Sequence, residues 1–157
     1  MKSVHIWLNE YSRSHQHPVN KLIHCVCIPL ILFSLLGILW QIEPFSLTGG
    51  LSYFSNLAVV FLLPILVYYL FLNWKLAIGM ACVSVIILGL LVLLEGLKIP
   101  LSTWIIYLVV FIFAWIFQFA GHIVEGKHPS FIQDIQFILI GPLWLLAFVY
   151  RKLNVKY

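Results

Sequence analysis

Long apolar stretches separated by short polar breaks dominate the pattern along this chain. Four of these stretches are long enough to cross the roughly 30 Å hydrocarbon core of a bilayer as α-helices. They cover approximately residues 22–40, 56–74, 76–94 and 101–122. Because only helices and closed barrels satisfy their backbone hydrogen bonds in lipid, the pattern predicts an all-α, integral membrane helical bundle. We expect residues 1–157 to form a single membrane domain.

The shortest polar break separates the second and third spans. It consists of Asn73, Trp74 and Lys75, so these two spans should form a tight antiparallel hairpin whose turn lies at the membrane surface. Longer polar breaks over residues 41–50 and 95–100 should form the other two connections between spans.

Residues 1–21 contain a short amphipathic pattern ahead of the first span. Apolar residues recur there at i, i+3, i+4 and i+7, and they are Val4, Trp7, Leu8 and Tyr11. This spacing predicts a short helix with one apolar face. Its opposite face is polar, which favours a position in the membrane interface rather than across the bilayer.

The last apolar segment, residues 135–150, is short for a membrane span and has Gly141 and Pro142 near its centre. A proline inside a helix removes one hydrogen bond and bends the helix. We therefore expect a kinked segment that either spans the bilayer thinly or re-enters it.

The placement of charge favours four crossings with a last segment that does not cross. Basic residues precede the first span and follow the last apolar segment, and they are Lys2, Arg13, Lys21, Arg151, Lys152 and Lys156. Because cytoplasmic segments are enriched in Lys and Arg, both chain ends should lie in the cytoplasm. The composition is 63% hydrophobic and 9% charged, and the net charge of +4 forms no continuous basic run. These values predict membrane lipid as a partner and no nucleic acid; the sequence indicates no oligomeric state.

All six histidines fall near the first and fourth spans. Those before or within the first span are His5, His15, His17 and His24, and those that flank the end of the fourth are His122 and His128. With four crossings, the segment before the first span and the segment after the fourth lie on the same side of the membrane. Imidazoles far apart in the sequence can therefore converge in space.

Amides and a carboxylate accompany these histidines at helical spacing. Asn20 precedes His24 by four residues, and Gln118, His122 and Glu125 fall at i, i+4 and i+7. Polar groups at membrane depth are costly unless they face the bundle interior or a ligand, so both stripes are candidate sites. Neutral imidazole binds iron, zinc or copper, and a nearby amide or carboxylate can bind the metal or orient a ligand.

Structural explanations stay open for each of these groups. His24 and His122 can be bonded to backbone carbonyls, His15 and His17 can be interfacial histidines, and Glu125 can be a loop charge. Two other functions also stay open: a non-enzymatic small membrane protein for transport or assembly, and a zinc-dependent membrane hydrolase. The sequence contains no P-loop, GxGxxG, GxSxG or CxxC motif.

Two signatures in the chain resemble those of the Mpo1-like family. The first reads Tyr11-Ser-Arg-Ser-His15-Gln-His-Pro-Val-Asn20-Lys-Leu-Ile-His24, followed by Ile28-Pro29. The second reads Gln118-Phe-Ala-Gly121-His122-Ile-Val-Glu125-Gly-Lys-His-Pro129. The two stand about ninety residues apart, and the resemblance covers nearly the whole chain, including the short C-terminal segment.

This resemblance implies an Fe(II)-dependent dioxygenase that uses O2 to shorten a long-chain 2-hydroxy fatty acid by one carbon, in alpha-oxidation. It implies that the metal ligands are His15, His24 and His122, and that their polar catalytic companions are Asn20, Gln118 and Glu125. His17 and His128 lie outside the family pattern. The compact loops and small size favour a bacterial inner membrane, in which the placement of Lys and Arg predicts a cytoplasmic N-terminus. The endoplasmic reticulum is the expected location in a eukaryote.

Overall fold

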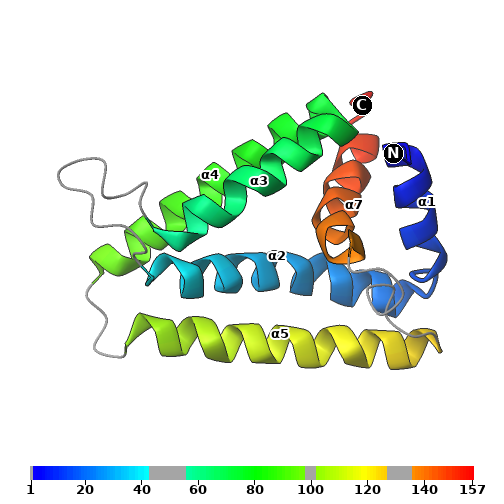
Figure 1. Ribbon diagram of the computed structural model, residues 1–157. Helices are drawn as coiled ribbons and strands as arrows, with labels where there is room; N and C mark the ends of the chain where they lie inside the picture. Colours follow the sequence, from blue (N-terminus) through cyan, green and yellow to red (C-terminus); the bar gives the residue numbers. More distant parts are fainter. Residues whose placement is uncertain (1, 43–55, 98–101, 127–135) are drawn as a thin grey trace.

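The computed structural model describes residues 2–42, 56–97, 102–126 and 136–157, and these ranges contain helices and no strand (Figure 1). The helices are α1 (Val4–Arg13), α2 (Pro18–Trp40), α3 (Leu57–Leu72), α4 (Trp74–Gly96), α5 (Thr103–Glu125) and α7 (Gln136–Lys152). The predicted all-α fold is confirmed. Most of the two longer polar breaks, and His128, lie outside the described residues.

Three helices are long and apolar enough to cross a bilayer. α2, α4 and α5 contain 23 residues each, whereas the apolar helix α3 contains 16. Large hydrophobic side chains are exposed on the outer surfaces of these helices, among them Leu63, Val85, Phe113 and Ile123. Such a surface suits lipid rather than water. Four crossings stay a prediction, because α3 is shorter than the roughly 20 residues of an ordinary spanning helix.

Side-chain caps determine where several helices begin. The ring of His17 accepts a hydrogen bond from Val19 N at 3.2 Å and caps α2. Asn73 alone separates α3 from α4: its backbone is extended, and its side-chain oxygen accepts bonds from Lys75 N and Leu76 N, both at 3.1 Å. The predicted tight hairpin therefore turns about a single residue.

Helices α2 and α5 lie side by side along most of their length (Figure 1). Two glycines permit this close approach. A Cβ atom on Gly121 of α5 would lie 2.5 Å from the side-chain oxygen of Asn20, and a Cβ atom on Gly37 of α2 would lie 2.6 Å from the Tyr107 ring. The packing of the pair therefore depends on the absence of a side chain at both positions.

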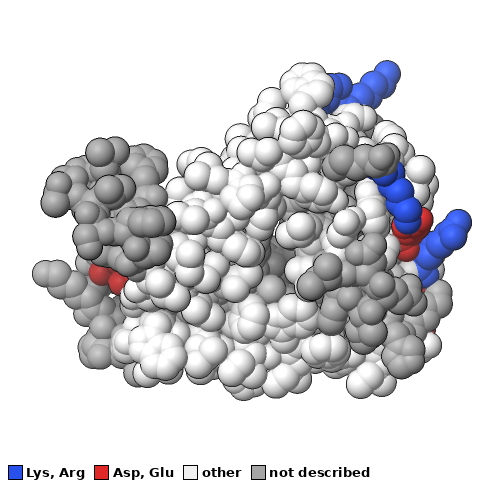
Figure 2. All heavy atoms as spheres, in the orientation of Figure 1, with Lys and Arg blue, Asp and Glu red and all other residues white. Residues whose placement is uncertain are grey.

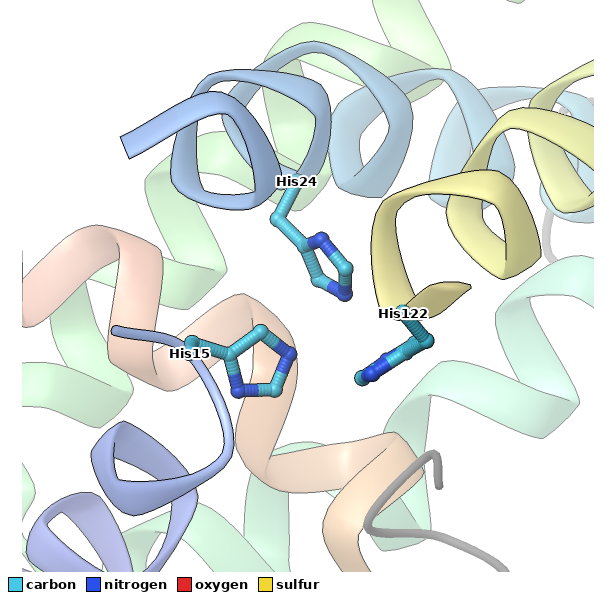
Figure 3. Close-up of side chains that lie close together, drawn as sticks. All are labelled: His15, His24 and His122. Carbon is cyan, nitrogen blue, oxygen red and sulfur yellow. The ribbon is translucent and has the colours of Figure 1, made fainter. Parts of the chain in front are cut away.

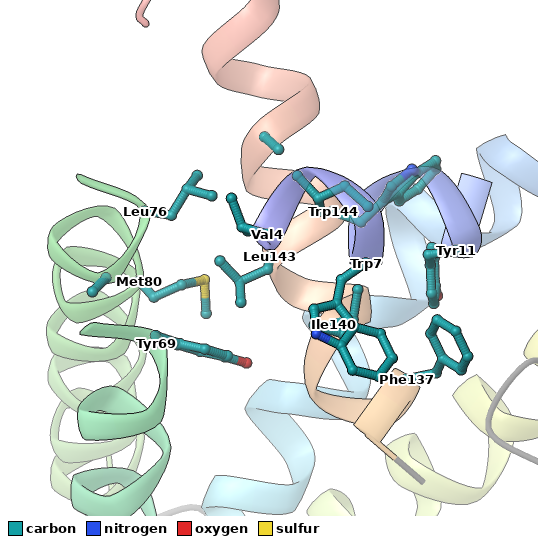
Figure 4. Close-up of a cluster of buried hydrophobic side chains, with 13 residues drawn as sticks. Val4, Trp7, Tyr11, Tyr69, Leu76, Met80, Phe137, Ile140, Leu143 and Trp144 are labelled. Carbon is teal, nitrogen blue, oxygen red and sulfur yellow. The ribbon is translucent and has the colours of Figure 1, made fainter. Parts of the chain in front are cut away.

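Helices α1, α3, α4 and α7 share a buried apolar cluster (Figure 4). The predicted apolar face of α1 lies in it, with Trp7 edge-on to Phe137 at a ring-centroid distance of 5.4 Å. The indole N–H of Trp144 donates to Ser12 Oγ at 2.8 Å and ties α7 to α1. The apolar face of α1 thus packs on protein, and the location of α1 in the membrane interface stays a prediction.

Both chain ends lie beside the turn between α3 and α4 (Figure 1). Lys75 Nζ donates to Lys156 O at 2.8 Å, Tyr150 Oη donates to Lys75 O at 3.2 Å, and the His5 ring stacks on Tyr157. The start of α2 and the end of α5 lie toward the same side of the molecule. α7 stays helical through its proline, and a last segment that does not cross stays a prediction.

The Lys and Arg side chains of the described residues gather on this side (Figure 2). We call it the basic end. The far end is the opposite one, where α2 and α4 finish and α5 begins.

Candidate metal centre

Three histidines from separate segments converge at the basic end (Figure 3). His15 lies in the link between α1 and α2, His24 lies in α2, and His122 lies in the last turn of α5. One ring nitrogen of each lies within 4.8 Å of the others. The three residues are 1%, 1% and 6% exposed, respectively, so they form a site that is buried within the protein. That these three histidines bind a metal stays a prediction.

Backbone carbonyls orient two of these imidazoles in the same way. His15 Nδ1 lies 2.8 Å from Tyr11 O, and His24 Nδ1 lies 3.0 Å from Asn20 O. Because a carbonyl oxygen only accepts, Nδ1 carries the hydrogen in both rings and Nε2 carries the lone pair. A backbone bond of this kind is the structural explanation that the sequence left open for His24. It is also how metal-binding histidines are usually oriented, so it does not argue against ligation.

Two ring nitrogens of the cluster are buried without a hydrogen-bond partner among the described residues, and they are His15 Nε2 and His122 Nδ1. Buried polar atoms are nearly always bonded, and an unsatisfied one costs about 1–3 kcal/mol. A divalent transition metal accepts lone pairs from several neutral imidazoles, so this set of donors fits such an ion. Among the described residues, no second group of three His, Cys, Asp or Glu side chains comes as close together.

Burial keeps the His15 imidazole neutral. Loss of hydration lowers the pKa of His15 to about 4, although the hydrogen bond to the Tyr11 carbonyl opposes the shift; the nearby His122 lowers the pKa further. The Tyr11 ring stacks on His15 with 4.2 Å between ring centroids and 10° between planes, which contributes to the burial. At pH 7 His15 therefore has a lone pair available for a metal.

Glu125 joins the segments that carry the histidines. Its carboxylate accepts hydrogen bonds from Gln16 N and His17 N, both at 2.8 Å, and from Asn20 Nδ2 at 3.1 Å. These donors belong to the link before α2 and to the first turn of α2. One side chain at the end of α5 therefore holds the link in place, which is more than a solvated loop charge would do.

Asn20 connects this carboxylate to the histidines. Its amide donates to Glu125, its backbone carbonyl accepts from His24, and its side-chain oxygen is buried without a partner among the described residues. That oxygen is the atom that a Cβ on Gly121 would meet. Gly121 directly precedes His122, so its missing side chain lets Asn20 fit beside the candidate site.

An apolar cavity of about 110 Å³ adjoins the three histidines. Gln118, four residues before His122, lines this cavity, and its side-chain oxygen Oε1 is buried without a partner in the described part of the chain. Most other lining side chains are apolar and come from α2, α3 and α7. The space far exceeds that needed by one water molecule, so it can hold an organic group.

The structure does not bring the other described histidines into the cluster. His5 stacks on Tyr157, and His17 is the exposed cap of α2. Sequence reasoning overlooked the carbonyl of Tyr11 as a partner of His15. The signal was present, because Tyr11 precedes His15 by the same four residues that separate Asn20 from His24.

Comparisons with known proteins agree with the resemblance. The family model described as "2-hydroxy-palmitic acid dioxygenase Mpo1-like" matches residues 1–153. The 2-hydroxy-palmitic acid dioxygenase MPO1 of Saccharomyces cerevisiae is 30% identical over 141 residues, which cover 88% of this chain and 75% of the yeast protein. No solved structure shows significant similarity. The match over nearly the whole length shows that this chain belongs to the Mpo1-like family.

Proposed function

We propose that this protein is an Fe(II)-dependent dioxygenase that shortens long-chain 2-hydroxy fatty acids by one carbon. The observation that carries the proposal is the group of three buried imidazoles beside an apolar cavity. Family membership supports the same activity, since the yeast relative is named as a dioxygenase of 2-hydroxy-palmitic acid.

The proposed reaction balances without an external reductant. A 2-hydroxy acid, R–CH(OH)–COOH, and O2 give R–COOH, CO2 and H2O. The bond between the carboxyl carbon and the hydroxyl-bearing carbon breaks, the substrate loses four electrons, and O2 accepts them. This pathway is the alpha-oxidation that the resemblance implies.

Three side chains would hold the metal: His15 and His24 through Nε2, and His122 through its unbonded Nδ1. When bound, iron supplies the positions at which the carboxylate and hydroxyl of the substrate meet O2. The buried protein surface around the histidines limits the access of water to the reacting atoms.

Gln118 is the residue that would contact the substrate head. Gln118 lines the cavity, and its buried Oε1, which has no partner among the described residues, can accept a hydrogen bond from the 2-hydroxyl group. Glu125 accepts hydrogen bonds from Gln16 N and Asn20 Nδ2, and neither Asn20 nor Glu125 is among the described residues that line the cavity, so we assign both a positioning role. They would keep the three histidines in one geometry.

The substrate would reach this site from the membrane. The long apolar helices and the basic end support an orientation in which the basic end lies in the cytoplasm, as the distribution of Lys and Arg predicts. In a bacterium this membrane would be the inner membrane, and in a eukaryote the endoplasmic reticulum.

A direct test is anaerobic purification in detergent, loading with Fe(II), and mass spectrometry after O2 and a long-chain 2-hydroxy fatty acid are added. The expected product is the acid one carbon shorter, formed only when iron and O2 are both present. His17→Ala, which alters an exposed histidine outside the cluster, is the matched control and should remain active. Zinc in the purified protein together with hydrolysis of a lipid ester would favour the hydrolase instead. Absence of any bound metal would favour a non-enzymatic role.

A further inference from the structure

The lining of the cavity beside the histidines follows one face of α2. The residues of α2 that line it, after His24, are Ile28, Ile31, Leu32 and Leu35. Their spacing keeps them on a single helical face. From His24 to Leu35 the helix rises by roughly 16 Å, at about 1.5 Å per residue. That length is close to half of the roughly 30 Å hydrocarbon core, which is the depth occupied by the acyl chains of one lipid leaflet.

The cavity is polar at one end and apolar along the rest of its length. The described polar groups at the histidine end include Gln118 with its unbonded Oε1. Farther along, the hydroxyl of Ser84 donates to Met80 O at 2.9 Å and that of Tyr69 donates to Leu139 O at 2.6 Å. Because those two hydroxyl hydrogens are already used within the protein, Ser84 and Tyr69 offer no donor to a ligand. The arrangement suits a molecule with one polar head and one hydrocarbon tail.

A packed apolar cluster adjoins the cavity, and its member Leu36 lies about three helical turns beyond His24 on α2. Leu62 of α3 lines the cavity and also belongs to a buried cluster with Leu36, Ile87 and Leu91. Leu35 lies next to this cluster in the sequence and is the last residue of α2 along the cavity. A tail that starts at the histidines would therefore meet Leu35 and Leu62 at its methyl end.

We propose that the unbranched tail of the substrate lies in this cavity along α2, and that Leu35 and Leu62 set the maximum chain length that the protein accepts. The proposal deepens the proposed function and rests on it for the identity of the head group. Each methylene that fits the cavity should strengthen binding about fourfold, which corresponds to about 0.8 kcal/mol. The first methylene that meets the two leucines should reverse this trend.

The test is anaerobic binding of saturated 2-hydroxy acids of increasing length to the iron-loaded protein in detergent. Leu35→Ala should move the optimum to longer acids, and Leu35→Phe should move it to shorter ones. The matched control is Leu30→Ala, on the same helix, because Leu30 lines a separate groove on the outside of α2 and α5. Its length profile should coincide with that of the unaltered protein. Coincident profiles for all variants would overturn the proposal.

A second measurement locates the tail directly. A 2-hydroxy acid with a photoreactive diazirine at its methyl end should cross-link near Leu35 or Leu62, as mapped by peptide mass spectrometry. Cross-links in the outer groove, near Leu30 or Phe113, would overturn the proposal. Because O2 is excluded from both measurements, they do not depend on turnover. Length-dependent binding without later oxidation would refute the proposed function and leave the tail site standing.

Discussion

The two ends of the α2–α5 pair are built alike. At the basic end the Glu125 carboxylate accepts hydrogen bonds from the link before α2 and from Asn20. At the far end Glu95 Oε1 accepts from Gln41 Nε2 at 2.6 Å and from Tyr107 Oη at 3.3 Å. Each end thus has one glutamate that joins elements distant in the sequence, and each has one glycine that admits a side chain of the other helix.

The ends differ in the polar atoms that they leave without partners. At the far end, the amide of Gln41 and the hydroxyl of Tyr107 both donate to Glu95. At the basic end, His15 Nε2 and His122 Nδ1 are buried with no partner among the described residues. A structural role accounts for the polar groups named at the far end. At the basic end, a structural role leaves the cost of burying two ring nitrogens without partners unexplained. A partly buried glutamate network alone therefore does not mark a site here, whereas the buried histidine nitrogens without partners among the described residues do.

The largest effect should follow the loss of a ring nitrogen. We expect His24→Ala and His122→Ala to lower iron affinity by at least about 100-fold. Loss of a residue that only hydrogen-bonds to a metal ligand already lowers metal affinity by about 10–100-fold. Turnover should fall to background. Metal content by mass spectrometry and product formation measure both effects. His17→Ala is the control; full metal content in His122→Ala would refute the assigned site.

The two glycines allow the second test. Gly121→Ala and Gly37→Ala each place a methyl group closer than 3 Å to a packed side chain, so each should lower stability by about 1–3 kcal/mol. Only Gly121→Ala should also weaken metal binding, because it displaces Asn20. Thermal unfolding in detergent, alongside metal titration, separates the two effects.

A third glycine supplies the control for that pair. A Cβ on Gly89 of α4 would meet no atom within 4 Å, so Gly89→Ala should neither lower stability nor change metal affinity. Equal loss of metal in Gly37→Ala and Gly121→Ala would mean that metal affinity depends on the overall packing of α2 against α5 rather than on the position of Asn20.

The two glutamates give the third test. Glu125→Gln removes the negative charge from a side chain that accepts three N–H bonds and should lower metal affinity by about 10–100-fold, as expected for a residue that positions ligands. Glu95→Gln should leave metal affinity unchanged. A positioning role also predicts that excess Fe(II) restores much of the activity of Glu125→Gln. Failure of excess metal to restore activity would assign Glu125 a direct part in the reaction.

The sequence predicted the helical elements well because apolar length and polar breaks are local properties. Asn73 illustrates this: its short polar break predicted the hairpin, and its side chain caps α4 in the structure. The early start of α2 could not be read from hydrophobicity, since it depends on the His17 cap and Pro18. The interfacial location of α1, and the number of crossings, depend on a bilayer as well as on the chain.

The candidate site was partly predictable for the same reason. Helical spacing pointed to His24, Gln118 and His122, and topology placed them on one side of the membrane. The sequence pattern could not predict that Glu125 would bond to backbone N–H groups more than a hundred residues away, because such contacts leave no periodic pattern. The close approach at Gly121 was equally hidden, since one glycine has many possible causes.

The smallest expected effect concerns the far end. Tyr107→Phe removes only the hydroxyl that donates to Glu95, while the ring stays packed against Gly37. The variant should lose about 1 kcal/mol of stability, which is the usual net worth of one hydrogen bond. Metal affinity and the chain-length profile should stay as in the unaltered protein, because the ring of Tyr107 keeps its packing in the apolar cluster that includes Leu62, and the lost hydroxyl bonds to Glu95. A change in metal affinity or in the chain-length profile would mean that the two ends are coupled along the helix pair. The far end would then not be purely structural.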